Sequence, residues 1–236
     1  IELTNDQIII STDGVPPHRS WYFSEGHPNN IDFESQGDGY EQNPNFIYSQ
    51  NFVISIPVSP SPKGIQITES GVDGDVGSDA HEFSMGPVGV ALDGVTIFNP
   101  LAAPGHDIED EKYSFDFYNG HPEMSGYYHY HTNTKGPLEV LEHKGLITNS
   151  TPGLSEIEVY GIMCDGTVVL GCTELDGSEP YESGLDAQNG HAHDLVDAEG
   201  TTHFSNRYHT HICPDQLSDH QFTPELQYYD DCNRSF

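Results

Sequence analysis

A composite motif that occurs twice is the sequence feature that most constrains the fold of this chain. The first copy runs "GVALDGVTIF" (89–98) and then "FDFYNGHPEMSGYYHYHT" (115–132). The second copy runs "GIMCDGTVVL" (161–170) and then "LDAQNGHAHDLVDAEGTTHFSNRYHTHI" (185–212). Each copy reads strand, Asp-Gly turn, strand, Asp-x-x-Asn-Gly-His and Tyr-His-x-His, so both copies are expected to fold alike.

The spacing within the two copies supports an internal duplication. From the turn aspartate to the next motif aspartate, the separation is 116 − 93 = 23 residues in one copy and 186 − 165 = 21 in the other. The repeat predicts a single domain over residues 1–236, with pseudo-repeats at about 86–135 and 157–213 packed around a pseudo-twofold axis.

The rest of the chain favours β structure. Its 24 glycines and 16 prolines interrupt the sequence too often for long helices. Short runs rich in branched apolar residues recur between turns, and each predicts a strand or hairpin. We therefore expect a mainly β fold, an antiparallel β-sandwich or barrel-like domain with long loops. The runs are "DQIIIST", "NFVISIPV", "GIQIT", "VGVALDGVTIFNP" and "SEIEVYGIMCDGTVVLGC".

Charge restricts the partners of this chain. With 7 basic and 38 acidic side chains, the formal net charge is −31. This sign disfavours nucleic acid as a partner and favours cations. No run of 18 apolar residues occurs, so we expect no transmembrane segment. The chain begins at Ile1 instead of Met, as a processed, mature chain would.

Four cysteines lie in the C-terminal third of the chain, and none forms a Cys-x-x-Cys pair. They allow three pairings, and they predict disulfides formed in an oxidising compartment. Sequential pairing is slightly preferred. The expected location is secreted, extracellular or in the cell envelope.

The histidines predict a metal site. Successive strand residues point to opposite faces, so His129 and His131 share one face, and so do His209 and His211. The alternating tyrosines should then face the core. The Asn-Gly turns bring further imidazoles, and three per copy suit copper or zinc, with copper slightly preferred. The further ring ligands are His121, His191 and His193.

Carboxylates and isolated histidines near these motifs receive separate predictions. Asp116 and Asp186 are candidate oxygen ligands or acceptors that fix a histidine tautomer. Asp93 and Asp165 are expected to be turn residues. The acidic loop Glu69–Glu82 is a possible calcium site, although a solvated loop is favoured. The isolated histidines expected on the surface or in the core are His81, His106, His203 and His220.

These motifs together resemble the YHYH-domain proteins. The resemblance rests on "VPPH", "GPVGVALDGVTIFNP", "FDFYNGHP", "GYYHYH" and "LDAQNGHAHD…YHTH", and it extends from about Gly14 to His211. It implies a secreted or cell-envelope protein with a shared histidine-rich site. By motif, that site also includes His18 of "PPH", and His143 matches a histidine common in the family. The chain departs from the family at "CDGTVVLGC", and it has Tyr-His-Thr-His in place of a second YHYH.

Three functions are compatible with the sequence. The first is a secreted, histidine-rich protein that sequesters, delivers or is stabilised by copper or zinc. The second is a metalloenzyme, either a zinc hydrolase or a copper oxidoreductase, for which Glu123, Asp194 and Tyr127 are candidate base or redox residues. The third is an acidic extracellular structural protein that assembles with itself through exposed strand edges.

Overall fold

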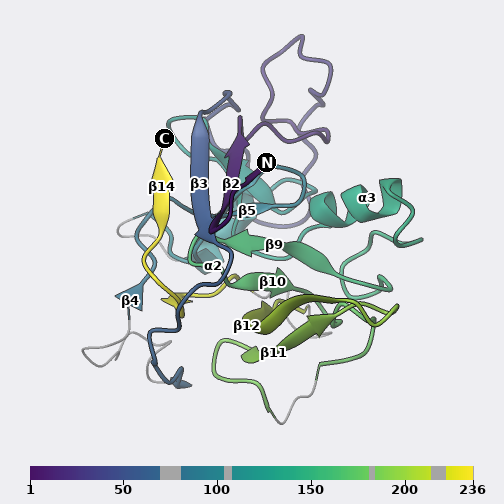
Figure 1. Cartoon of the computed structure of the whole chain (residues 1–236). Helices are drawn as coiled ribbons and strands as arrows, with labels where there is room; N and C mark the ends of the chain where they lie inside the picture. Colours follow the sequence, from purple (N-terminus) through teal and green to yellow (C-terminus); the bar gives the residue numbers. More distant parts are fainter. Residues whose placement is uncertain (70–80, 104–107, 181–183, 214–221, 236) are drawn as a thin grey trace.

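The computed structural model of the chain describes residues 1–69, 81–103, 108–180, 184–213 and 222–235 (Figure 1). Strands dominate it, as the sequence predicts. They are β1 (Glu2–Leu3), β2 (Gln7–Thr12), β3 (Phe52–Pro57), β4 (His81–Glu82), β5 (Pro87–Ala91), β6 (Thr96–Phe98), β7 (Gly120–Pro122), β8 (Tyr128–Tyr130), β9 (Val159–Met163), β10 (Val168–Leu170), β11 (Gly190–Val196), β12 (Thr202–His211), β13 (Leu226–Gln227) and β14 (Asn233–Ser235).

An eight-stranded sheet is the centre of the molecule, with the order β11-β12-β10-β9-β5-β6-β8-β7. The β5–β9 pair at its middle is antiparallel, and from there each half continues in the same way. In each half a hairpin is followed by a parallel neighbour and then by an antiparallel edge strand. This matching arrangement agrees with the predicted duplication, which stays a prediction.

A four-stranded sheet, β1-β2-β3-β14, packs on the larger sheet. In Figure 1, β2, β3 and β14 run roughly across the direction of β9 and β10. Strand β3 alternates buried and half-buried residues, and its Phe52 and Ile54 share one core with Val88 and Val90 of β5. The packing is sandwich-like, and the strands of the described residues form no closed barrel.

The helices are short. They are α2 (Ile108–Glu111), the 3-10 turn η1 (Lys112–Ser114) and α3 (Lys135–His143). Helix α3 was not predicted, because Gly136 and Pro137 in its first turn mask a helical pattern. It begins after Thr134, whose hydroxyl accepts a hydrogen bond from the Gly136 N–H. Leu138 and Leu141 then face the core.

Two sequence predictions need correction. The "GIQIT" segment alternates in burial but is not a strand, because its backbone joins none of the three sheets of the described residues. The disulfides are Cys164–Cys232 and Cys172–Cys213, so the preference for sequential pairing was wrong. Cys172 follows β10 and Cys213 follows β12. These strands are parallel neighbours, so their C-terminal ends coincide.

Two further expectations concern a membrane and calcium. Within the described residues, no helix has the length and apolar character that crossing a membrane requires. The candidate calcium ligands Asp73, Asp75 and Asp79 lie outside the described residues, as do His106 and His220.

Candidate metal centres

The first histidine cluster, named site 1, consists of His121, His129 and His131. His129 and His131 follow the two-residue period of β8 and its continuation, so both rings project from one face. Strand β7 pairs antiparallel with β8 and places His121 directly opposite His129. Tyr128 and Tyr130 point the other way and are buried in the core, as predicted.

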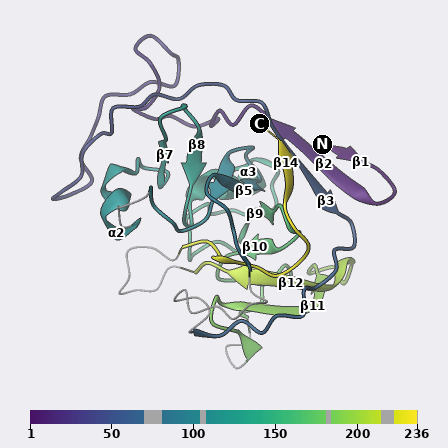
Figure 2. The ribbon, with the colours of Figure 1, turned by 90° about the vertical axis from the view of Figure 1, so that its left-hand side faces the viewer.

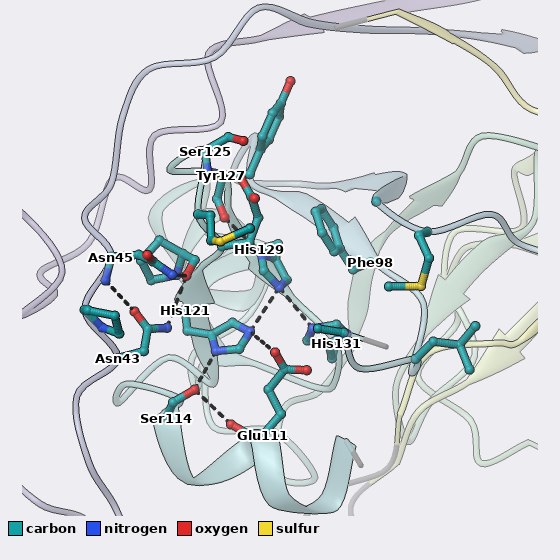
Figure 3. Close-up of a pocket in the computed structure, with 18 of the residues that line it drawn as sticks. Asn43, Asn45, Phe98, Glu111, Ser114, His121, Ser125, Tyr127, His129 and His131 are labelled. Carbon is teal, nitrogen blue, oxygen red and sulfur yellow. Dashed lines mark hydrogen bonds and ion pairs between the residues drawn. The ribbon is translucent and has the colours of Figure 1, made fainter. Parts of the chain in front are cut away.

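The three imidazoles of site 1 converge through their Nε2 atoms (Figure 3). The His121–His129 Nε2 distance is 3.1 Å, and the His129–His131 distance is 3.0 Å. Metal–nitrogen bonds of about 2.0–2.1 Å at tetrahedral or octahedral angles would place ligand atoms roughly 2.9–3.4 Å apart. The observed spacing is therefore that of ligands on one ion.

The opposite ring nitrogens fix the tautomers of site 1. His129 Nδ1 lies 2.9 Å from the Tyr127 carbonyl oxygen, and His131 Nδ1 lies 2.5 Å from that of Asn99. A carbonyl only accepts, so both Nδ1 atoms carry the proton. His121 Nδ1 lies 2.6 Å from Ser114 Oγ, whose own hydrogen goes to the Glu111 carbonyl. All three Nε2 lone pairs therefore face one another.

Burial keeps these rings neutral. The three side chains are each about 2% exposed. Burial lowers the pKa of His131 to about 4. Burial, reinforced by neighbouring imidazoles, holds the pKa of His121 and of His129 well below the ordinary value. A neutral imidazole is the form that binds a metal ion.

Site 1 opens onto a cavity of about 820 Å³. Phe98 stacks on the His129 ring at a centroid distance of 3.8 Å and forms part of the wall. Glu111, at the end of α2, approaches from the side, with Oε1 3.9 Å from His121 Nε2 (Figure 3). It lies beside the ligand cluster without belonging to it.

The second cluster, named site 2, consists of Glu174, His191, His209 and His211. Strand β12 carries His209 and His211 on one face, and the antiparallel β11 places His191 opposite His209. Figure 2 shows β11 and β12 far from β7 and β8, because the two pairs form opposite ends of the large sheet.

The carboxylate of Glu174 lies among the rings of site 2. Its Oε1 is 3.0 Å from His191 Nε2 and 3.4 Å from His211 Nε2, and its Oε2 is 3.3 Å from His209 Nε2. Three imidazole nitrogens and one carboxylate make a four-ligand set.

The ring tautomers of site 2 match those of site 1. His209 Nδ1 lies 2.9 Å from the Arg207 carbonyl oxygen, and His211 Nδ1 lies 2.9 Å from that of Gly171. The Nε2 atoms therefore face the cluster. Although it is fully buried, His209 Nε2 has no hydrogen-bond partner among the described residues. A buried acceptor without a partner is costly, and a bound ion removes that cost.

His193 is a peripheral member of site 2. Its Nε2 lies 3.3 Å from Glu174 Oε1, but its side chain is 41% exposed. It is outside the tight group of ligand atoms, so it contacts the carboxylate without completing the set.

Asp116 and Asp186 lie outside the two groups of ligand atoms. Asp116 Oδ1 accepts hydrogen bonds from the Tyr118 N–H at 2.8 Å and from the Tyr128 hydroxyl at 2.7 Å. Asp186 is bound in the same way by the Gly190 N–H and the Tyr208 hydroxyl. Both carboxylates hold the Asn-Gly turn in shape, and the turn carries the histidine that follows.

His18 also lies apart from the clusters. Its Nε2 is 2.9 Å from the Tyr130 hydroxyl, and its ring stacks on Tyr118 at 3.5 Å. Tyr130 points away from the ligand face of β8, so His18 is on the wrong side of the strand for site 1. Burial lowers its pKa to about 3.

Other candidates have structural contacts. Asp93 and Asp165 accept hydrogen bonds from backbone N–H groups two residues ahead, as turn residues do. Asp194 accepts from the Asn206 N–H, and Glu123 accepts from the Ser125 N–H. Tyr127 lines the site 1 cavity. Of the isolated histidines, His203 pairs with Asp197 at 2.8 Å. His143, which matches a family histidine, is exposed and is the last residue of α3.

Sequence reasoning missed Glu174 and Glu111. The only available signal for Glu174 was covalent. It lies two residues after Cys172, and His211 lies two residues before Cys213, so one disulfide draws both toward the same place. No spacing rule connects Glu111 with a histidine ten residues later across a turn.

Comparison with known proteins adds one match. A family model described as "YHYH protein" matches residues 72–178. This segment contains all of site 1 and reaches Glu174, whereas the three histidines of site 2 lie beyond it. No curated protein and no solved structure matches the chain.

Proposed function

Over residues 72–178 the chain belongs to the YHYH family, and from that premise we propose that it is a transition-metal-binding protein with two centres. Site 1 would bind one copper or zinc ion through three imidazoles. Site 2 would bind a second ion through three imidazoles and a carboxylate. The two disulfides support a protein that works outside the cell, where thiols oxidise.

One observation carries the proposal. Three buried Nε2 lone pairs face one another at 3.0–3.1 Å between neighbouring rings in site 1. Neutral rings repel one another in this arrangement, and a protonated ring is disfavoured because burial lowers its pKa. A metal cation accepts all three lone pairs at once and offsets both costs.

The donor atoms favour copper or zinc. Imidazole nitrogen suits these ions, whereas calcium and magnesium require oxygen ligands. Site 1 offers nitrogen alone, and site 2 adds a single carboxylate. Between the two metals, intrinsic affinity favours copper.

The four ligands of site 2 suit an ion that stabilises the fold. A structural zinc site has a complete tetrahedral set of protein ligands. Those ligands lie on β11, on β12 and in the segment that follows β10, so an ion there would tie three parts of the chain together. Sequestration or delivery would then depend on site 1.

Metal content per chain tests the proposal. We expect the parent to bind two equivalents of copper or zinc, and the His129→Ala/His131→Ala and His209→Ala/His211→Ala variants to bind one each. The matched control is His143→Ala/His203→Ala, which removes two histidines outside both clusters and should retain two equivalents. If both cluster variants bind as much metal as the parent, the proposal is wrong.

A further inference from the structure

The cavity beside site 1 is large enough to hold a small organic molecule. Its volume is about 820 Å³, far more than a few waters need and within the range of small-molecule sites. All three ligand histidines line it, so the side of site 1 not covered by protein faces this space (Figure 3).

Site 1 leaves room for a ligand on its ion. Three protein donors leave a fourth position for water or substrate, as in catalytic zinc sites. The Glu111 carboxylate approaches this side, with Oε1 3.9 Å from His121 Nε2, and it lies outside the group whose donor atoms are within 4.8 Å of one another. In site 2 the equivalent position is taken by Glu174.

The side chains of the cavity wall favour ligands with an apolar body. Apolar and aromatic side chains form much of it, among them Met85, Phe98, Leu101 and Met124. Such a wall favours a ligand with an apolar body, because each Å² of apolar surface buried contributes about 25 cal/mol.

The charge of the cavity lining disfavours anionic ligands. Its charged side chains are all acidic: Glu41, Asp110, Glu111 and Glu123. Within the described part of the lining there is no lysine or arginine. Acidic side chains that line a cavity repel anions, so a carboxylate or phosphate ligand is disfavoured.

We propose that the ion of site 1 takes a small organic ligand from this cavity, neutral or cationic, with an apolar or aromatic body and one neutral nitrogen or oxygen donor. The proposal rests on the proposed function, since it needs an ion at site 1. It adds that this ion has one coordination position without a protein ligand, and that the shape and charge of the cavity determine which molecules bind there.

Titration of the copper-loaded full chain tests this, with the copper absorption band as the readout. Three probes are compared: imidazole has a neutral nitrogen donor, 4-phenylimidazole adds an apolar body, and benzoate is an aromatic anion. We expect 4-phenylimidazole to bind at least about tenfold more tightly than imidazole, since a buried phenyl ring adds apolar contact. Benzoate should not change the band. The His129→Ala/His131→Ala variant should lose the response to both imidazoles.

A cavity-filling variant checks where the probe binds. Leu101→Trp places a larger side chain in the cavity wall and should abolish the advantage of 4-phenylimidazole over imidazole. Leu146→Trp is the matched control, because Leu146 is exposed and does not line the cavity. It should retain the full advantage.

The outcomes separate the two proposals. Copper content is measured first and again after titration. A chain that holds neither copper nor zinc at site 1 overturns both the proposed function and this inference. A chain that holds it but responds to no probe, binds both imidazoles equally or prefers benzoate overturns this inference alone.

Discussion

Sites 1 and 2 have the same backbone arrangement but differ in their fourth donor. In each, an edge strand places one histidine opposite the first member of a His-x-His pair. In each, both rings of the pair donate Nδ1–H to backbone carbonyls. Site 2 then receives Glu174 among its rings, whereas beside site 1 the Glu111 carboxylate lies 3.9 Å from the His121 ring and outside the ligand group.

Different parts of the chain determine the positions of the imidazoles and the presence of a carboxylate ligand. Strand pairing sets the positions of the imidazoles, so it is common to both ends of the sheet. The connections outside the strands decide whether a carboxylate completes the set. Glu174 follows β10, beside a disulfide, and Glu111 ends the short helix α2. A closed site and an open one can therefore share one sheet.

Removing disulfides should give the largest effect. Cys172–Cys213 closes 41 residues and Cys164–Cys232 closes 68, so the loss of either should cost about 4 kcal/mol of unfolding free energy. Only the Cys172→Ser/Cys213→Ser variant should also weaken metal binding at site 2, because this bond holds Glu174 near His211. Denaturant unfolding and metal titration measure the two effects.

The Cys164→Ser/Cys232→Ser variant is the control for that comparison. It should lose similar stability while both sites keep their metal affinity. Equal loss of site 2 affinity in the two variants would mean that the local disulfide does not position Glu174.

Exchanging each carboxylate for an amide should separate the sites next. Glu174→Gln removes an anionic ligand, so site 2 affinity should fall at least about 100-fold, the upper end of what loss of a supporting contact costs. Glu111→Gln should change site 1 affinity by less than about threefold. Competition with a chromophoric chelator measures both, and an equal loss at the two sites would contradict the distinction between them.

Ser114 should have a smaller effect, confined to site 1. Its hydroxyl accepts the Nδ1–H of His121 at 2.6 Å, whereas the corresponding position beside His191 is Gly184. Ser114→Ala should therefore weaken site 1 about tenfold and leave site 2 unchanged. Ser125→Ala, which removes another hydroxyl lining the same cavity, is the control and should leave both affinities unchanged.

The smallest expected effect concerns the pH at which site 1 releases its metal, compared with a site made of ordinary imidazoles. Because burial lowers the pKa of His131 to about 4, and that of His121 and His129 well below 6.5, protons compete with the metal only at low pH. Site 1 should hold its ion at pH 5.5, where an ordinary imidazole is about nine-tenths protonated. Stepwise dialysis measures release. Half-release near pH 6.5 would show that burial does not protect the rings.

The sequence predicted the parts of both sites that depend on local rules. Strand alternation placed the His-x-His rings on one face, and the Asn-Gly turns returned His121 and His191 to them. Strand and turn rules did not place Glu174, because it meets the rings through the parallel pairing of β10 with β12 and the Cys172–Cys213 disulfide beside it. Local rules also do not place His18, since the packing of its ring on Tyr118 and its contact with the Tyr130 hydroxyl leave no local signal.

An anomalous-difference map of metal-loaded crystals, collected at the absorption edge of the added copper or zinc, tests the central claim most directly. The account predicts one peak bonded to Nε2 of His121, His129 and His131, and a second among His191, His209, His211 and Glu174. Only the first peak should have a non-protein ligand on its cavity side. A map without a peak among the three rings of site 1 would contradict the account.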